Sequence, residues 1–247
     1  MDASLWDRLA EAERNLNADS AQATLDLCQT VLGRYPRCLR ACRLVAECLW
    51  AKGDTAGAIQ LHRAVLQADP EDLIARYGLA MALEEEGLDE AIRELEIAFS
   101  LAPTDPEVRQ ALQRLYQQRD KGPLRPLEMG GDALARLYAK GRLWPRVLVE
   151  TTHLLLSQPR RLDLRVLHAE ALWRTAAFAE AAGCCQDILQ VYPHCLKPSL
   201  ILGDILQQRG AGETAQEWFR KAQELDPENT VAIELFGQEE AKRRIGE

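Results

Sequence analysis

Several signals that would place the chain at a membrane are missing. No window approaches the roughly 20 consecutive apolar residues that a membrane-spanning helix needs. The segment Met1 to Asp7 lacks the positive flank and apolar run of a signal peptide. What is present is an ordinary balance for a soluble chain of 247 residues, with 47% hydrophobic and 28% charged residues. We therefore expect a cytoplasmic protein of one or two domains with no membrane partner.

A strongly basic composition is also missing, because the net charge is −8. Binding to phosphates requires clustered lysine and arginine, so we expect no nucleic-acid partner. The charge is uneven, since residues 1–120 hold 21 acidic and 13 basic side chains, whereas residues 121–165 hold 4 acidic and 9 basic ones. A local basic surface in 121–165 is one interpretation. We favour the other, in which these cations lie on solvated faces of helices and a loop.

The cysteines form no evenly spaced framework. Their number is odd, which is typical of reduced thiols, and their spacing matches no zinc pattern. Most fall at helix positions where other parts of the chain carry leucine, alanine or phenylalanine, so we expect small buried apolar residues and no metal. They are Cys28, Cys38, Cys42, Cys48, Cys184, Cys185 and Cys195.

Catalytic constellations are absent as well. The four histidines, His62, His153, His168 and His194, are scattered, and no glycine-rich phosphate loop occurs. The run Glu84 to Glu86 is interpreted as the solvated end of a helix. We expect neither an enzyme nor a cofactor.

Prolines recur at nearly constant spacing. Pro36, Pro70, Pro103, Pro159, Pro193 and Pro227 are separated by 34, 33, 56, 34 and 34 residues. A period near 34 indicates a repeat array. Before each proline, apolar residues recur at three- and four-residue steps, which predicts two amphipathic helices per repeat and an all-α protein.

The sequence also repeats on a larger scale. Leu44 to Trp50 (LVAECLW) returns 123 residues later as Leu167 to Trp173 (LHAEALW). We predict a first module over 1–119, a connector over 120–131 and a second module over 132–247. Each module holds three helical hairpins and a terminal helix, the latter at 106–119 and 230–244. The connector contains Pro123 and Pro126, which interrupt helices.

One repeat carries the clearest family pattern, at Leu202, Gly203, Leu206, Gly210, Ala215, Phe219, Ala222 and Pro227. This order resembles the tetratricopeptide repeat (TPR). The resemblance implies a right-handed α-solenoid whose concave wall comes from the first helix of each hairpin and commonly holds a peptide or partner helix. Gly203 and Ala215 are small because the two helices of the hairpin cross closely there.

Carried onto this chain, the resemblance places a set of partner-binding residues on the concave wall. They are Arg43, Glu47, Trp50, Tyr77, Met81, Glu84, Arg136, Lys140, Glu170, Trp173, Asp204 and Gln207, with Val166 and Leu200 beside them. Each module presents a tryptophan near a carboxylate, a suitable anchor for an apolar or basic-apolar segment. The alternative is that Trp50 and Trp173 pack against the next repeat. The lysines and asparagines of the family's chaperone-tail clamp are absent.

Together these features favour a non-catalytic adaptor that binds a protein or peptide of unknown identity. The alternative is a structural protein that self-associates, as a homodimer, through apolar residues of the last helix, Ile233, Leu235 and Phe236. A third alternative is a fragment of a larger TPR-containing protein.

Overall fold

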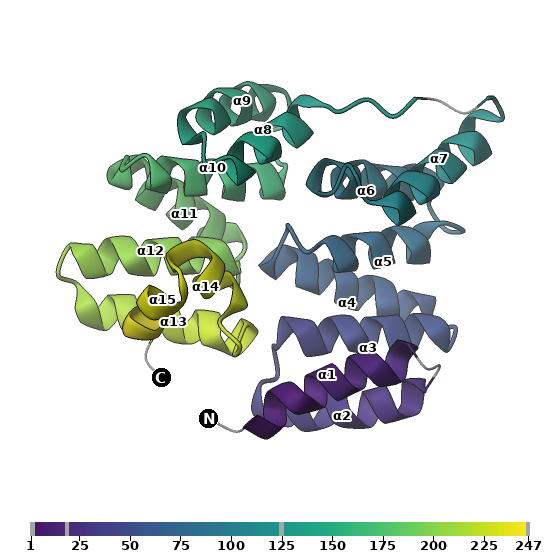
Figure 1. Ribbon diagram of the computed structural model, residues 1–247, viewed down its shortest axis with the longest axis horizontal. Helices are drawn as coiled ribbons and strands as arrows, with labels where there is room; N and C mark the ends of the chain where they lie inside the picture. The colour runs from purple at the N-terminus through teal and green to yellow at the C-terminus, as the bar shows by residue number, and fades with distance from the viewer. Residues whose placement is uncertain (1–2, 18–19, 124–125, 246–247) are drawn as a thin grey trace.

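The computed structural model describes residues 3–17, 20–123 and 126–245, and these residues form helices and no strand. The N-terminal half of the chain is three antiparallel helical hairpins followed by one helix (Figure 1). These helices are α1 (Ala3–Asn17), α2 (Ala21–Arg34), α3 (Leu39–Ala51), α4 (Thr55–Ala68), α5 (Leu73–Leu83), α6 (Leu88–Leu101) and α7 (Pro106–Asp120). The all-α prediction is confirmed.

The C-terminal half begins at Gly131 and repeats the arrangement with one difference. Its helices are α8 (Gly131–Lys140), α9 (Trp144–Ser157), α10 (Leu162–Arg174), α11 (Phe178–Val191), α12 (Leu196–Gln208), α13 (Gly212–Leu225), α14 (Thr230–Phe236) and α15 (Gln238–Ile245). The single terminal helix expected at 230–244 is wrong. Gly237 adopts a left-handed φ of 83° and divides it into α14 and α15.

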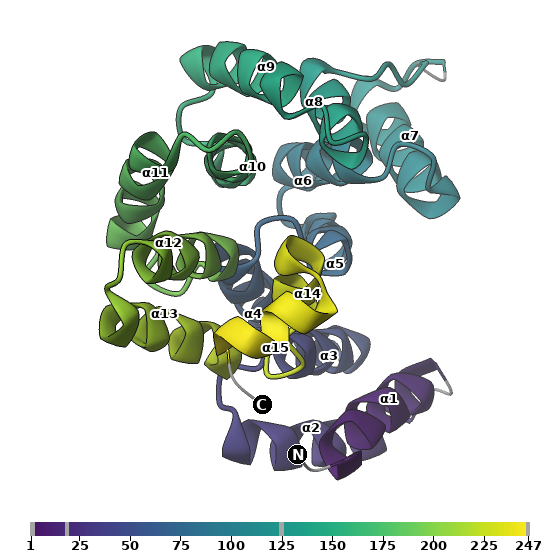
Figure 2. The same cartoon turned by 60° about the vertical axis from the view of Figure 1, so that its left-hand side comes forward.

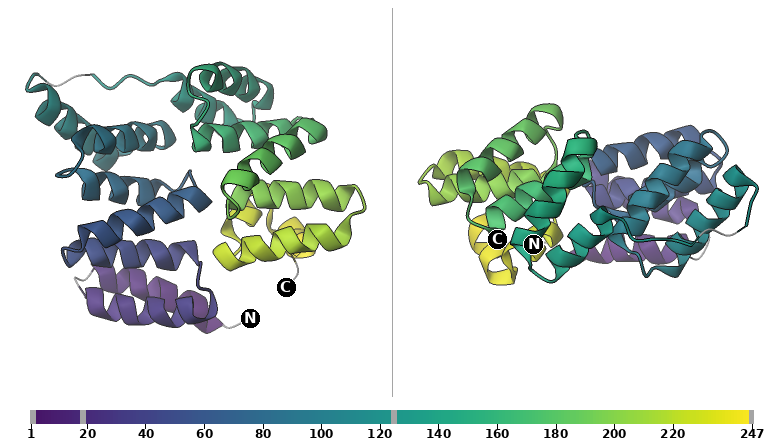
Figure 3. Two further views of the ribbon diagram at one scale, coloured as in Figure 1. Left: turned by 180° about the vertical axis from the view of Figure 1, so that it is seen from behind. Right: turned by 90° about the horizontal axis from the view of Figure 1, so that it is seen from above.

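The two halves lie side by side. We call α1–α7 the N-terminal row and α8–α15 the C-terminal row. The segment between α7 and α8 passes from one row to the other, and the C-terminal row runs back beside the N-terminal row (Figures 1 and 3). Both chain termini therefore lie at the same end of the molecule. Within the connecting segment, Leu127 packs against the core of the N-terminal row.

Local chemistry explains why the hairpins begin and end where they do. The Asp54 carboxylate accepts a hydrogen bond from the Gly57 N–H at 2.9 Å and caps α4. Just before it, Gly53 takes a φ of 85°, which a residue with a Cβ rarely adopts, and ends α3. Asp105 caps α7 in the same way, and Pro106 occupies the first position of that helix.

The close crossing expected at Gly203 is present. A Cβ atom at this position would lie 2.8 Å from the ring of Phe219, which is fully buried in α13. Ala215 is fully buried as well. The small residues thus allow the aromatic ring of the second helix to lie directly on the backbone of the first.

The curvature of each row follows from which of its helices contact one another. The first helices of neighbouring hairpins contact one another, α1 with α3, α3 with α5 and α10 with α12. Among the described residues, no two second helices of neighbouring hairpins contact each other to the same extent. The first helices therefore line the inner, concave side of each row, and Figure 2 shows the two rows curving toward each other around α14 and α15.

Candidate functional site

The inner wall of the N-terminal row carries the first group of expected binding residues, on α3. Arg43, Glu47 and Trp50 are spaced by four and three residues and share one helical face. Trp50 is 47% exposed. Among the described residues, no side chain accepts a hydrogen bond from its indole N–H. A large apolar ring is therefore left in contact with solvent on the concave side.

The next helix of the wall, α5, adds a second apolar group. Tyr77 and Met81 are half-buried and pack on the row's core, and Ile74, one turn earlier on the same face, is 50% exposed. Beyond them, Arg114 of α7 donates to Glu84 at 2.8 Å and contacts the Met81 sulfur at 3.7 Å. We call Trp50, Ile74, Tyr77, Met81 and Glu84, together with Arg43, Glu47 and Arg114, the inner apolar surface.

The charges around this surface are predominantly negative. Arg43 and Arg114 are paired with Asp72 and Glu84. Burial raises the pKa of Glu47, against the nearby Arg43, which lowers it. Burial also raises the pKa of Tyr77, and the Glu107 carboxylate adds to that shift. The two cations of this surface are therefore neutralised within the chain.

The equivalent tryptophan of the C-terminal row, Trp173, lies in a different environment. Trp173 is half-buried and donates its indole N–H to Asp204 at 2.7 Å. The ring of Phe236, from α14, meets the Trp173 indole edge-on with centroids 5.7 Å apart. Arg244, from α15, pairs with the other oxygen of Asp204 and lies over the Phe236 ring. The chain's own last two helices therefore occupy this part of the concave wall.

Two other expected residues of the C-terminal row are held in internal pairs. Glu170 is 6% exposed and accepts from Lys197 at 3.0 Å, and Lys197 also donates to Glu71 of the N-terminal row at 2.6 Å. Burial alone would lower the pKa of Lys197, but Glu71 and Glu170 raise it well above its usual value. Arg136 is buried and donates to Asp163 at 2.6 Å.

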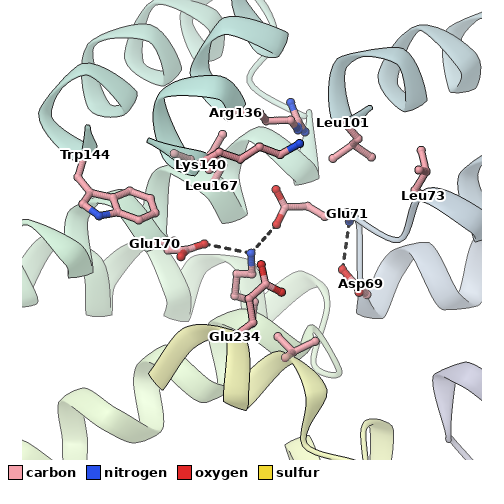
Figure 4. A pocket seen from close by; sticks show the side chains of 13 residues that line it. Asp69, Glu71, Leu73, Leu101, Arg136, Lys140, Trp144, Leu167, Glu170 and Glu234 are labelled. Carbon is pink, nitrogen blue, oxygen red and sulfur yellow. Dashed lines mark hydrogen bonds and ion pairs between the residues drawn. The ribbon is translucent and has the colours of Figure 1, made fainter. Parts of the chain in front are cut away.

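These groups border a polar cavity of about 340 Å³ between the rows (Figure 4). Arg136 and the exposed Lys140 lie on one side of it, and Glu234 of α14 lies on the other. Glu71 and Glu170 approach from opposite rows toward the Lys197 ammonium. Arg136, Glu71, Glu170 and Lys197 thus pair within the chain, and the pair of Lys197 with Glu71 joins the two rows beside the cavity.

Further contacts join the rows. Arg40 donates to Glu228 at 2.6 Å, and the Arg37 guanidinium lies 3.2 Å from Nδ1 of His194. Leu39 and Ala68 of the N-terminal row pack into the main core of the C-terminal row. We call this boundary, together with the Lys197 pairs, the seam.

The structure divides the expected site residues into two groups. Arg136, Glu170, Trp173 and Asp204 make internal contacts, and Gln207 and Lys140 are exposed. In the N-terminal group, which belongs to the inner apolar surface, Trp50 is exposed and the other residues are half-buried. Sequence reasoning missed Ile74 and Arg114. The three-residue step from Ile74 to Tyr77 could have indicated Ile74, because it places both on one face.

Cys28 and Cys38 have buried thiols. Burial raises the pKa of Cys28 to about 12 and that of Cys38 to about 11, so both thiols stay protonated at neutral pH. No group of three or more metal-ligating side chains occurs among the described residues. None of the described helices has the length and apolar character to cross a bilayer.

Comparison with known families gives a consistent result. Two models described as tetratricopeptide repeat match the chain, one over residues 49–115 and the other over 7–72 and 166–230. A search of curated proteins found no match.

Several solved structures are similar to the chain, at low identity. The TPR domain of P58(IPK) is 13% identical, with 98% of this chain and 66% of that one covered and a TM-score of 0.42. The TPR2AB domain of yeast Sti1, in its pHSP90 complex, is 16% identical, with 99% and 98% covered and a TM-score of 0.40. YrrB, described as a TPR protein with an unusual peptide-binding site, is 14% identical, with 84% and 96% covered and a TM-score of 0.35.

Proposed function

The chain belongs to the tetratricopeptide repeat family, and from this premise we propose that it is a non-catalytic adaptor whose inner apolar surface binds a segment of a partner protein. The observation that carries the proposal is Trp50. It is 47% exposed on the concave wall, with no acceptor for its indole N–H among the described residues. Exposed tryptophans flanked by other apolar groups are the residues that dominate binding energy at interfaces.

We also propose that residues 1–119 and 132–247 are two copies of one module, joined by 120–131. In support, each row consists of three hairpins followed by further helix, and Trp50 and Trp173 occupy equivalent positions 123 residues apart. In this proposal only the first copy keeps its concave wall open for a partner. In the second copy, α14 and α15 cover part of the concave wall, and other residues of the wall take part in the seam.

The partner's chemistry follows from the surface. Ile74, Tyr77 and Met81 offer an apolar floor next to Trp50, and the methionine is a side chain that adapts to different shapes. The cations of the surface are paired within the chain, whereas Glu47 has no hydrogen-bonding partner among the described residues. We infer a partner segment with apolar anchors and at least one lysine or arginine, which would contribute a cation–π contact or pair with Glu47.

Self-association is the second candidate, but the structure weakens its basis in the sequence. Of the three apolar residues expected to pair with another copy, Leu235 is 3% exposed and Phe236 packs on Trp173. Ile233 alone is exposed, at 39%. One exposed isoleucine is much less than the apolar area that a stable homodimer buries.

The test is affinity capture from a native cell extract with the intact chain, Trp50→Ala and Trp218→Ala as baits. Trp218 is the matched control, because it is a half-buried tryptophan of α13 that lies outside the inner apolar surface. A captured protein is then titrated against each bait in solution. We expect Trp50→Ala to weaken binding by at least about 2 kcal/mol, roughly thirtyfold, and Trp218→Ala to have no such effect.

Equal affinity for the intact chain and for folded Trp50→Ala would contradict the proposal. Sedimentation velocity of the intact chain addresses the second candidate. A mass that rises with protein concentration, together with capture of the chain alone, would make self-association the leading function.

A further inference from the structure

The outer face of α9 carries an exposed stripe that the concave-surface proposal does not use. Its members follow one another at steps of four and three residues, the spacing of a coiled-coil seam. They are Arg142, Arg146, Val149, His153, Leu156 and Arg160, of which the middle four lie within α9. All six are exposed, and Leu156 reaches 79%. We call this set the α9 stripe.

Equivalent helices show that the fold does not need apolar residues at these places. The alignment rests on the buried positions Val147 and Thr151 of α9, which correspond to Ala181 and Cys185 of α11 and to Ala215 and Phe219 of α13. Where α9 has Val149, His153 and Leu156, the other second helices have mostly polar or small residues. These are Asp26, Thr30 and Gly33; Gln60, Ala64 and Gln67; Arg93, Ile97 and Ser100; Gly183, Asp187 and Gln190; and Glu217, Lys221 and Glu224.

The stripe is also locally positive in a negatively charged protein. Between residues 133 and 162 the only carboxylate is Glu150, which is half-buried, whereas Arg142, Arg146 and Arg160 are exposed at the two ends of the stripe. Arg142 and Arg160 make no ion pair with a described residue, and Arg146 lies over the Tyr138 ring. The chain as a whole carries a net charge of −8, so this face differs in sign from the overall charge and would attract an acidic ligand.

From this charge and spacing we propose that the α9 stripe docks an acidic amphipathic helix of a partner protein. The partner's apolar residues would pack beside Val149 and Leu156, and its carboxylates would pair with the arginines at both ends. The heptad spacing fits one helix laid along α9. This surface is separate from the inner apolar surface and does not depend on it.

An anionic membrane and a second copy of the chain fit the α9 stripe less well than an acidic helix. An anionic membrane would also meet the neighbouring second helix α11, which carries Glu180 and Asp187 at equivalent outer positions and would be repelled. A second copy pairing through the same stripe would place arginines against arginines.

The test uses a synthetic, fluorescently labelled helical peptide of about three heptads, with leucine at positions a and d and glutamate at e and g. Its counterpart has lysine in place of every glutamate. Fluorescence anisotropy is measured with the full chain, with the double variant Val149→Ser/Leu156→Gln, and with Val191→Gln. Val191 is a matched control because it is 61% exposed but lies outside the stripe.

We expect saturable binding of the glutamate peptide that weakens with added salt. The lysine peptide should not bind the α9 stripe, so any binding of it to the intact chain should be unchanged in the double variant and weakened in Trp50→Ala. The double variant should bind the glutamate peptide at least tenfold more weakly, and Val191→Gln and Trp50→Ala should bind that peptide like the intact chain. Absence of saturable binding would overturn the proposal, as would an equal loss in Val191→Gln. A loss in Trp50→Ala would place the peptide on the inner apolar surface instead.

Two further measurements address the other occupants. If the chain co-sediments with phosphatidylserine vesicles and the double variant does not, while the glutamate peptide fails to bind, the stripe is a membrane contact and the proposal is wrong. If the intact chain self-associates in sedimentation velocity and the double variant is monomeric, the stripe is an interface between copies, and the proposal is wrong again.

Discussion

Trp50 and Trp173 lie in similar sequence segments but in different structural environments. Trp173 donates to Asp204 and is covered by Phe236, whereas Trp50 is 47% exposed. The position equivalent to Asp204, 123 residues earlier, holds Met81, which cannot accept a strong hydrogen bond. The carboxylate of Asp204 and the covering ring of Phe236 thus distinguish the half-buried Trp173 from the exposed Trp50.

A second pair of equivalent positions shows compensation inside the cores. In the N-terminal row the His62 ring lies against Gly78, where a Cβ atom would sit 2.6 Å from the ring. The corresponding residues of the C-terminal row are Cys185 and Ile201, both fully buried. The large and small side chains have exchanged places between α4 and α5 on one side and α11 and α12 on the other. Volume at the contact is kept while the chemistry changes.

One of the two largest expected effects separates the two tryptophan sites. Asp204 is 1% exposed and accepts hydrogen bonds from Trp173 and Gln208 and pairs with Arg244. Asp204→Ala leaves the indole N–H of Trp173 unpaired and removes one of the two carboxylates that pair with Arg244, which keeps its pair with Glu240, so we expect a loss of about 2 to 3 kcal/mol in the free energy of unfolding. Met81→Ala, at the equivalent position, should cost about 1 kcal/mol because its side chain is half-buried. Urea denaturation measures both, and equal costs would contradict the comparison.

The other large effect concerns pH and the core of the N-terminal row. Burial lowers the pKa of His62 to about 4, and no described group accepts or donates a hydrogen bond at its Nδ1 atom. Below pH 6.5 the imidazole of His62 binds a proton in the unfolded chain, whereas in the folded chain it stays neutral until the pH reaches about 4. The stabilisation from the neutral ring is therefore complete above pH 6.5 and is lost as the pH falls to 4, by about 3 kcal/mol.

The variant that isolates this effect copies the C-terminal row, as His62→Cys/Gly78→Ile. It has no imidazole at this position, so its unfolding free energy should fall less between pH 7 and pH 4 than that of the intact chain. The carboxylates titrate in both proteins and cancel in the difference. Identical pH profiles would show that His62 contributes nothing to acid sensitivity.

A smaller effect tests the volume exchange itself. Gly78→Ala places a methyl group against the His62 ring, and we expect a net loss of about 1 kcal/mol, because overpacking exceeds the gain in helix propensity. In the background of His62→Cys, the same substitution should be neutral or stabilising. A double-mutant cycle measured by urea denaturation reports the coupling, and additive effects would argue against direct contact.

The smallest effect is spectroscopic. In single-tryptophan proteins, with phenylalanine replacing the others, Trp50 should emit at longer wavelength and be quenched more by acrylamide than Trp173, since it is the more exposed. Adding the captured partner should shift only the Trp50 emission toward shorter wavelength. A partner that shifts Trp173 instead would place binding on the C-terminal row.

The repeat architecture could be predicted because its causes are local. The prolines recur every 34 residues or so, apart from one interval of 56. The helix caps Asp54 and Asp105 and the small residue Gly203 act on their own helix or on the helix next to it. Which part of the concave wall is covered by the chain itself could not be predicted, because this depends on ion pairs between residues far apart in the sequence. Lys197 meets Glu71, 126 positions away, and Arg40 meets Glu228, 188 positions away. Side-chain charge alone does not show which of many carboxylates an ammonium group will reach.

The C-terminal wall also depends on a backbone detail. Gly237 turns the chain so that α15 brings Arg244 to Asp204, while Phe236, at the end of α14, reaches Trp173. A helix continuing straight from Thr230 to Arg244, as the periodicity predicts, would carry the arginine elsewhere. The apolar pattern of this segment is short and its glycine has several structural explanations. The sequence therefore predicts a terminal helix, but not the bend at Gly237 that divides it.

The seam has a mechanical consequence. An open helical array stretched by its ends extends like a spring, since each repeat touches only its neighbours. Here both termini lie at the same end of two antiparallel rows (Figure 1). A pulling force on the termini would load the contact of Arg40 with Glu228 before it reaches that of Lys197 with Glu71. The rows should separate contact by contact, like a zipper, at low force and with little elastic extension beforehand.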